Sequence, residues 1–223
     1  MATILVIGAS RGIGFEFVRQ YREAGDRVIA TARDAAGLDK LKALDATAIR
    51  VDVSDPASIS GLAWQLDGEK IDIALYVAGV FTTGDAGAPP TREDFDHVMH
   101  ANVLGAMQAI PQVAPLVEAA KNGRVAFITS AMGKIDGVES SYAWIYRVSK
   151  SALNMAVATA QLNYPQATMV AISPGWVQTD MGGAGADLTV EQSVTSMRKA
   201  LAALTPKQKG AFLDHDGAPF TSW

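Results

Sequence analysis

The sequence predicts an α/β fold built on one doubly wound parallel sheet. Short apolar segments alternate with helical patterns along all 223 residues, a glycine-rich turn follows the first segment, and no linker or repeat divides the chain. Strands that alternate with helices pair in parallel through right-handed crossovers, which places helices on both faces of the sheet. The predicted strand order is 3-2-1-4-5-6-7. With 49% hydrophobic residues, the chain is long enough to bury a large core.

The N-terminal residues predict the first strand and the first helix. The apolar run at residues 4–7 is too short for a helix and ends at Gly8, which is typical of a buried strand. Residues 15–24 carry apolar side chains at helical spacing, and Gly25 stands where a helix C′ glycine belongs. Further strands are expected at residues 27–31, 48–51, 71–77, 124–129 and 168–172, with a short seventh at 211–213.

Helices are expected between these strands. Asp55 followed by Pro56 predicts the N-cap and first residue of a helix that ends near residue 66. A helical pattern covers residues 92–121, where Pro111 and Pro115 each lack a backbone N–H, so a break or kink is expected there. The remaining helices are expected at residues 38–44 and 142–162, and a loop at 78–91.

Composition and charge exclude several classes of function. The net charge is −4 and Lys and Arg form no block, so neither nucleic acid nor a membrane is expected as a partner. The absence of cysteine excludes disulfides and thiolate ligands, and no metal site is predicted. The apolar N-terminal run is too short for a signal peptide, and no segment approaches the roughly 20 apolar residues of a membrane span. A cytoplasmic protein is expected.

The glycine-rich turn predicts a phosphate-binding site. Gly8, Gly12 and Gly14 follow a strand and open a helix, a geometry that directs backbone N–H groups and the positive helix end towards a phosphate. Glycine is needed because a Cβ would block the sharp turn and the approach of a pyrophosphate. Three glycines are also compatible with a flexible loop, but their position between strand and helix favours dinucleotide binding.

A tyrosine and a lysine lie four residues apart in a predicted helix. Tyr146 and Lys150 project from one helix face, about one turn apart. A phenol has a reference pKa of about 10, and a nearby ammonium lowers that pKa, so the pair can exchange a proton with an alcohol or ketone oxygen. Alone, such a pair is also compatible with an ordinary surface contact. Tyr142 is a second phenol, but no lysine stands four residues after it.

Seven short motifs follow one another along the chain: Gly8-x-x-x-Gly12-x-Gly14, Asp52-Val53, Ala78-Gly79, Asn102, Ser130, Tyr146-x-x-x-Lys150 and Pro174-Gly175. Their order and approximate spacing resemble the short-chain dehydrogenase/reductase family over nearly the whole chain. The most similar branch is the small carbonyl-reductase-like group, which includes C-factor-like proteins. The resemblance implies a single Rossmann domain over residues 1–223 with about seven strands, a small-molecule carbonyl or alcohol substrate, and a homodimer or homotetramer.

The resemblance also implies roles for individual residues. Tyr146 would be the general acid/base, and Lys150 would lower its pKa and hold the nicotinamide ribose. Ser130 would orient the substrate oxygen, and Asn102 would hold a water that links Lys150 to solvent. Taken alone, Asn102 could be a helix cap and Ser130 a turn former. The residues expected to contact a cofactor are Gly8, Ser10, Arg11, Gly12, Ile13, Gly14, Arg33, Asp52, Val53, Ala78, Gly79, Tyr146, Lys150, Pro174, Gly175, Val177 and Thr179.

Three positions depart from the family pattern. Ile7 stands where a threonine is common before the first glycine, and Tyr76-Val77 replace two asparagines at the end of the fourth strand. Two polar contacts at the strand ends are therefore missing, and looser packing around the cofactor is expected, without loss of binding.

The end of the second strand predicts which cofactor is used. An NAD-specific site places a carboxylate there, which binds the ribose hydroxyls and repels a 2′-phosphate. Ala32 occupies that position, Arg33 follows it, and Arg11 can approach the same point. Two guanidinium groups suit a phosphate, so NADP(H) is expected over NAD(H). Alternatively, both arginines are ordinary solvated surface residues. Asp34 lies close by and could pair with Arg33.

The expected function is an NADPH-dependent reductase of ketones or aldehydes, or the reverse reaction. The alternative is an NADP(H)-binding signalling or regulatory protein with little turnover; the intact Ser130, Tyr146 and Lys150 favour the enzyme. The glycine-rich residues 179–187 favour a mobile substrate lid, expected near residues 180–195. Apolar residues that could line a pocket, or simply pack, are Phe81, Met132, Ile135, Trp144, Trp176 and Met181.

Overall fold

The structure, a computed structural model that describes residues 1–223, contains one parallel sheet of seven strands. The strand order is β3-β2-β1-β4-β5-β6-β7, as predicted, so the chain reverses direction across the sheet between β1 and β4. In such sheets a ligand binds beyond the carboxyl ends of the strands at this reversal. The strands are β1 (Thr3–Ile7), β2 (Arg27–Ala32), β3 (Thr47–Arg50), β4 (Ile73–Tyr76), β5 (Arg124–Ile128), β6 (Thr168–Ile172) and β7 (Phe212–Leu213).

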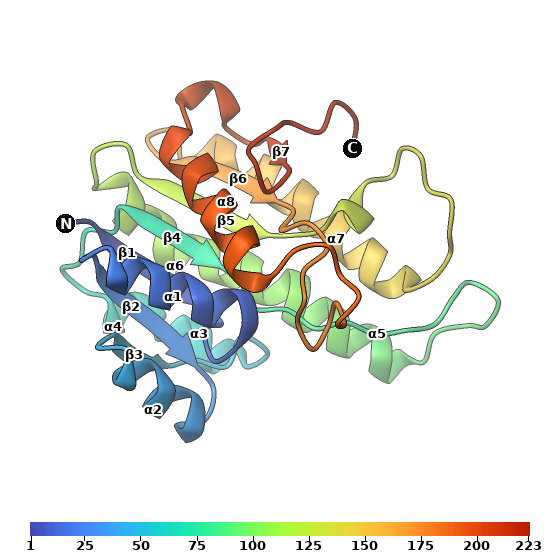
Figure 1. Ribbon diagram of the computed structural model, residues 1–223, viewed down its shortest axis with the longest axis horizontal. Coiled ribbons are helices and arrows are strands. Elements are labelled where there is room, and N and C mark those ends of the chain that lie inside the picture. The colour runs from blue at the N-terminus through green and yellow to red at the C-terminus, as the bar shows by residue number, and fades with distance from the viewer.

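Helices cover both faces of the sheet (Figure 1). Buried side chains of α1, α2 and α8 form one core with the sheet, and those of α3, α4, α6 and α7 form a second core on the opposite face. None of the helices combines the length and the hydropathy that a membrane span requires. The helices are α1 (Gly12–Glu23), α2 (Ala35–Ala43), α3 (Pro56–Ser60), α4 (Leu62–Gln65), α5 (Arg92–Met99), α6 (Gly105–Glu118), α7 (Trp144–Ala160) and α8 (Val190–Ala203).

The apolar run of β1 is explained by its place between the two cores. Side chains of a strand alternate between the faces of the sheet. Ile4 and Val6 accordingly pack in the core beneath α1 and α8, whereas Leu5 and Ile7 pack in the core beneath α6 and α7. A strand buried on both faces must be apolar at every position, which is why this segment does not alternate with polar residues.

The break expected at Pro111 and Pro115 is wrong, because α6 continues through both prolines. The two prolines lie four residues apart on the exposed side of the helix, and Met107, whose carbonyl loses its donor to Pro111, is exposed as well. Water can therefore hydrate the carbonyl groups that lose a partner. The helical region is interrupted earlier, by a π-helix at His100–Leu104 between α5 and α6.

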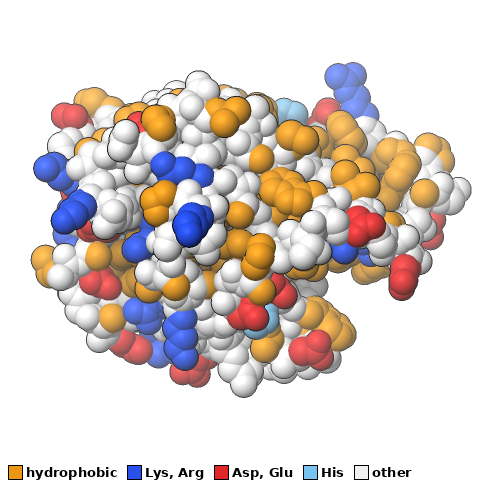
Figure 2. Space-filling view, turned by 90° about the horizontal axis from the view of Figure 1, so that it is seen from above, with side chains coloured by type: hydrophobic (Ala, Val, Ile, Leu, Met, Phe, Trp, Pro, Cys, Tyr) orange, Lys and Arg blue, Asp and Glu red, His pale blue; other side chains and the backbone are white.

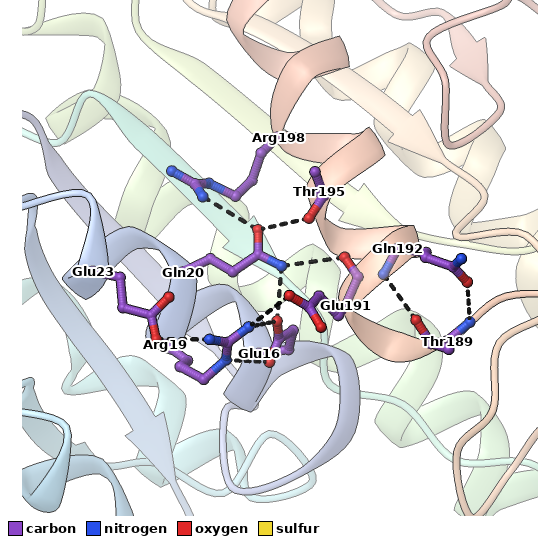
Figure 3. A network of polar contacts seen from close by, with 9 residues as sticks. All are labelled: Glu16, Arg19, Gln20, Glu23, Thr189, Glu191, Gln192, Thr195 and Arg198. Atoms are coloured by element: carbon purple, nitrogen blue, oxygen red, sulfur yellow. Dashed lines mark hydrogen bonds and ion pairs between the residues drawn. The ribbon is translucent and has the colours of Figure 1, made fainter.

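Polar contacts fasten α8 to α1 (Figure 3). The Gln20 side-chain oxygen accepts hydrogen bonds from the Thr195 hydroxyl and from the Arg198 guanidinium, each at 3.2 Å. Thr189 and Gln192 form a capping box that fixes the first turn of α8. Because α1 begins at the glycine turn and α8 follows the predicted lid, these contacts fix the C-terminal end of the lid relative to that turn.

Candidate active site

The glycine turn is packed closely against the end of β4. A Cβ on Gly8 would lie 2.6 Å from the backbone nitrogen of Ala78, and a Cβ on Gly14 would lie 2.1 Å from the carbonyl oxygen of Gly8. Gly8 also has a φ of +87°, which side chains rarely adopt. No side chain caps α1 at Arg11, so the first N–H groups of the helix face the end of the sheet without a capping partner.

The looser packing expected around the cofactor stays a prediction, and the end of β4 itself is closely packed. Tyr76, which replaces a polar family residue, is 2% exposed, and its ring stacks on Phe127 with the ring centroids 5.9 Å apart. Its hydroxyl donates to the carbonyl of Ala101 in the π-helix, at 3.1 Å. The neighbouring Gly8 N–H donates to the Thr31 hydroxyl. The larger side chain therefore fills the space and braces the π-helix against the sheet.

Tyr146 and Lys150 are both buried on one face of α7, beside the carboxyl end of β5. The Lys150 ammonium donates to the carbonyl of Ile128 at 2.9 Å and lies 5.6 Å from the centre of the Tyr146 ring. Ser130 follows β5 directly, and its hydroxyl accepts from Met132 N–H while lying within hydrogen-bonding reach of Tyr146. Tyr142 is half exposed and precedes α7. The structure therefore brings Ser130, Lys150 and Tyr146 together.

Burial controls the protonation of this group. Burial raises the pKa of Tyr146 to about 12, and hydrogen bonding with Ser130 opposes that rise. Burial also lowers the pKa of Lys150 to about 8. The Lys150 ammonium donates to the Ile128 carbonyl, and its expected lowering of the Tyr146 pKa stays a prediction. At neutral pH, Tyr146 thus holds a proton that it can donate.

Asn102 lies in the π-helix and joins three parts of the site. Its side-chain oxygen accepts from Val80 N–H at 2.7 Å, and its side-chain nitrogen donates to the Val80 carbonyl at 2.9 Å. The same nitrogen donates to the Ser149 hydroxyl, which donates to the carbonyl of Tyr146. A Cβ on Gly79 would lie 3.1 Å from the Asn102 oxygen and 3.5 Å from the Lys150 nitrogen. Asn102, Gly79 and Lys150 are therefore neighbours.

The other predicted cofactor residues lie around this centre. Thr179 lies beside Gly12, with its methyl group 3.7 Å from the position of a Cβ on that glycine. Pro174 and Gly175 follow β6, where the Pro174 carbonyl accepts from Ser193 of α8. Val177 pairs with Leu188 in an isolated bridge. Asp52 and Val53 follow β3, and the Val53 carbonyl lies beside Gly105 after the π-helix, 2.5 Å from the position of a Cβ on that glycine. Ser10, Ile13 and Ala78 lie in or beside the glycine turn.

Cationic side chains gather at the ends of β2 and β3. Arg33 is exposed and forms no ion pair, and the Arg50 guanidinium donates to the Arg33 carbonyl at 3.1 Å. The anticipated pairing of Asp34 with Arg33 is not formed, because the Asp34 carboxylate caps α2 by accepting from Gly37 N–H. Arg11 instead pairs with Asp180, at 2.8 Å.

The region above Tyr146 is apolar. Phe81 packs edge-on against Tyr146 with the ring centroids 4.9 Å apart, and it also lies against Tyr142. Ile135, Trp176 and Met181 are exposed, whereas Met132 and Trp144 are only partly so. Figure 2 shows hydrophobic side chains gathered towards the right-hand end of the molecule, from which the loops before α5 and α7 project in Figure 1.

Several contacts at the site were not expected from the sequence. Ser149, which links Asn102 to Tyr146, could have been found from its position in the helix turn between Tyr146 and Lys150. Asp136 accepts from the hydroxyl of Ser222, and its N–H donates to the carbonyl of Trp223, so the chain end is bound to the loop after β5. No local pattern signals this contact. The first residues of α8 also occupy part of the predicted lid range, since the helix begins at Val190.

The depressed pKa of Lys150 predicts how stability changes with pH. Between about pH 8 and the unfolded-state pKa of about 10.4, the unfolded state binds more protons, so stability rises with pH. Lys150→Met removes the buried charge, and we expect the free energy of unfolding at pH 7 to rise by about 1–4 kcal/mol.

Urea unfolding of both proteins between pH 7 and 10, followed by tryptophan fluorescence, measures this effect. The exposed Lys70 gives a matched control in Lys70→Met, for which no change is expected. The lowered pKa of Lys150 is contradicted if Lys150→Met is less stable than the wild type. It is also contradicted if the stability of Lys150→Met rises between pH 8 and 10 as much as that of the wild type.

Comparisons with known proteins show the family of the chain. The family model for short chain dehydrogenases matches residues 2–187. The chain is 31% identical to 1-hydroxy-2-glutathionyl-2-methyl-3-butene dehydrogenase of a Rhodococcus species, over the whole of both chains. A short-chain dehydrogenase/reductase of Burkholderia multivorans, solved with bound NADP, is 31% identical and superimposes with a TM-score of 0.88 over 100% of this chain and 99% of that one.

A second solved structure is similar over its whole length. The carbonyl reductase Sniffer of Drosophila melanogaster superimposes with a TM-score of 0.90 at 25% identity, covering 100% of both chains. The match of the family model to most of the chain, together with the relative at 31% identity, decides the family. The chain is a member of the short-chain dehydrogenase/reductase family of oxidoreductases.

Proposed function

We propose that this protein is an NADPH-dependent reductase of ketones or aldehydes, which also catalyses the reverse oxidation. The observation that carries the proposal is the buried, protonated Tyr146 phenol, placed beside Ser130 and Lys150 at the carboxyl end of the sheet. A protein that only bound a dinucleotide would have no use for a proton donor at this position.

The residues at the strand ends fit a dinucleotide. The glycine turn forms a cradle that a Cβ would fill, and the uncapped start of α1 offers N–H groups to a pyrophosphate. Gly8, Gly12 and Gly14 would hold the pyrophosphate, Asp52 the adenine, and Arg11 with Arg33 a 2′-phosphate. Thr179 and Lys150 would border the nicotinamide end. The chemistry supplied by a bound nicotinamide is hydride transfer to the carbonyl carbon.

The protein's own residues would handle the proton. Ser130 donates a hydrogen bond to the substrate oxygen and orients it, and Tyr146 transfers its phenolic proton to that oxygen, which yields the alcohol. Lys150 stabilises the phenolate left on Tyr146 and returns a proton from solvent. Asn102 holds the Val80 backbone and Ser149 so that these groups keep their relative positions.

The exposed apolar residues suggest the substrate and the assembly. Phe81 and Tyr142 beside Tyr146 favour a substrate with an apolar group next to its carbonyl. Residues 1–223 would act as one domain, with the segment near residues 180–195 closing over the substrate as a lid. Exposed apolar side chains on α6 and α7, Met107, Val148 and Met155, support association into a homodimer or homotetramer.

Tyr146→Phe keeps the ring but removes the transferable proton. We expect kcat to fall by about 10²–10⁴-fold, the range for a lost general acid, while the Kd for NADPH stays nearly unchanged. NADPH oxidation with a panel of aromatic, aliphatic and quinone carbonyls measures turnover. Tyr142→Phe is the matched control and should retain activity. A wild-type kcat in Tyr146→Phe together with a lower kcat in Tyr142→Phe would show that Tyr142 is the proton donor. A wild-type protein that turns over no carbonyl would refute the proposed reductase activity.

Cofactor preference tests the arginines at the strand ends. We expect NADPH to bind more tightly than NADH by about 2 kcal/mol, the scale of hydrogen bonds to charged groups. Arg33→Ala combined with Ala32→Asp should shift the preference towards NADH, since the new carboxylate accepts from the ribose hydroxyls. Fluorescence titration gives both Kd values, and Arg92→Ala on α5 serves as the control. Equal affinities in the wild type, or tighter binding of NADH, refute the assignment.

A further inference from the structure

We infer that Asp180 tunes cofactor selectivity by competing with the 2′-phosphate of NADP(H) for Arg11. This inference rests on the proposed NADP(H) site and adds a residue outside it. Asp180 lies beside the glycine turn, in the segment that follows β6. Its carboxylate would hold Arg11 until the cofactor arrives.

The contact joins two segments that are 169 positions apart in the chain. Arg11 directly precedes Gly12 in the glycine turn, and its guanidinium lies 2.8 Å from the Asp180 carboxylate. Both side chains are mostly exposed, at 74% and 80%, so either can move away without unpacking a core. The pair can therefore open without a change in the core.

The backbone around Asp180 holds its carboxylate near the turn. Thr179 accepts from Gly182 N–H with its hydroxyl and from Gly183 N–H with its carbonyl, which folds the segment into a tight turn. Trp176 adds a hydrogen bond from its indole nitrogen to the Gly182 carbonyl. The other end of the segment is fixed by the capping box of α8 and its contacts with α1 (Figure 3).

The charges nearby single out Arg11 and Asp180. Arg33 has no acidic partner, Asp34 is engaged as the cap of α2, and Asp52 accepts from the N–H of Ser54. Asp180 is thus the carboxylate that neutralises a guanidinium at this edge. A phosphate monoester carries more charge and more acceptor oxygens than a carboxylate, so it displaces Asp180 from Arg11.

The displacement has a cost that only one cofactor incurs. NADPH must break the Arg11–Asp180 pair before its 2′-phosphate binds the guanidinium, whereas NADH leaves the pair intact. Asp180 therefore weakens the binding of NADPH and reduces the preference for NADPH over NADH that Arg11 and Arg33 create. Removing the carboxylate should strengthen the binding of NADPH selectively.

The test compares Asp180→Asn with Asp187→Asn, which changes another exposed carboxylate of the same segment that forms no ion pair. Titrations of NADPH and NADH against each protein, followed by tryptophan fluorescence, give the Kd values. We expect Asp180→Asn to bind NADPH about two- to five-fold more tightly, the range set by an exposed ion pair, and NADH with unchanged affinity. Asp187→Asn should match the wild type. When Arg11→Ala is already present, adding Asp180→Asn should leave the affinity for NADPH unchanged.

The outcomes separate this inference from the function on which it rests. A wild type that prefers NADPH, with an Asp180→Asn variant that shows no gain, weaker binding or an equal gain for both cofactors, overturns the role of Asp180 and leaves the NADP(H) assignment standing. A gain that persists in Arg11→Ala also overturns it. A wild type that binds NADH more tightly overturns the cofactor assignment and this inference together.

Discussion

The site depends on the side-chain amide of Asn102. This one group satisfies both the N–H and the carbonyl of Val80, and it also binds Ser149 on α7. The loop after β4, the π-helix and the helix that carries Tyr146 and Lys150 are thereby tied together at one point. Because the Asn102 amide is fully buried, and a buried polar group without a partner costs about 1–3 kcal/mol, the arrangement in which it binds Val80 is favoured.

The π-helix explains how Asn102 reaches this position. A π-helical turn contains an additional residue, which rotates the face of the following helix by about 100° relative to the preceding one. Tyr76 braces this turn from below through its hydrogen bond to Ala101. Tyr76 at the end of β4 therefore supports the π-helix and packs against Phe127 in the core.

The sheet topology could be predicted from the sequence because it follows from local patterns. Apolar runs too short for helices, the glycine turn and the alternation of strands with helices together determine the strand order that the structure has. The continuous helix through Pro111 and Pro115 could not be predicted, since it depends on which side of α6 faces solvent. The π-helix likewise leaves no mark in the apolar periodicity.

The candidate site was predictable in its members but not in its electrostatics. Tyr146 and Lys150 share a helix face, which spacing alone predicts. Their pKa values depend on burial and, for Tyr146, on Ser130, a partner that follows a distant strand. The Arg11–Asp180 contact spans most of the chain and has no sequence signal, although each residue lies in a segment that was singled out for its glycines. Local sequence patterns therefore predict where the site residues lie, whereas contacts between distant segments determine their pKa values and ion pairs.

Amide hydrogen exchange of Val80 in the wild type and in Asn102→Ala tests the role of Asn102 most directly. The account predicts that Val80 exchanges slowly in the wild type and rapidly in the variant, while the amides of β4 and β5 keep their protection. Unchanged protection of Val80 in Asn102→Ala would contradict the account, because some other group would then hold the loop. Loss of protection across the whole sheet would contradict it too, since Asn102 would then support the fold and not the site.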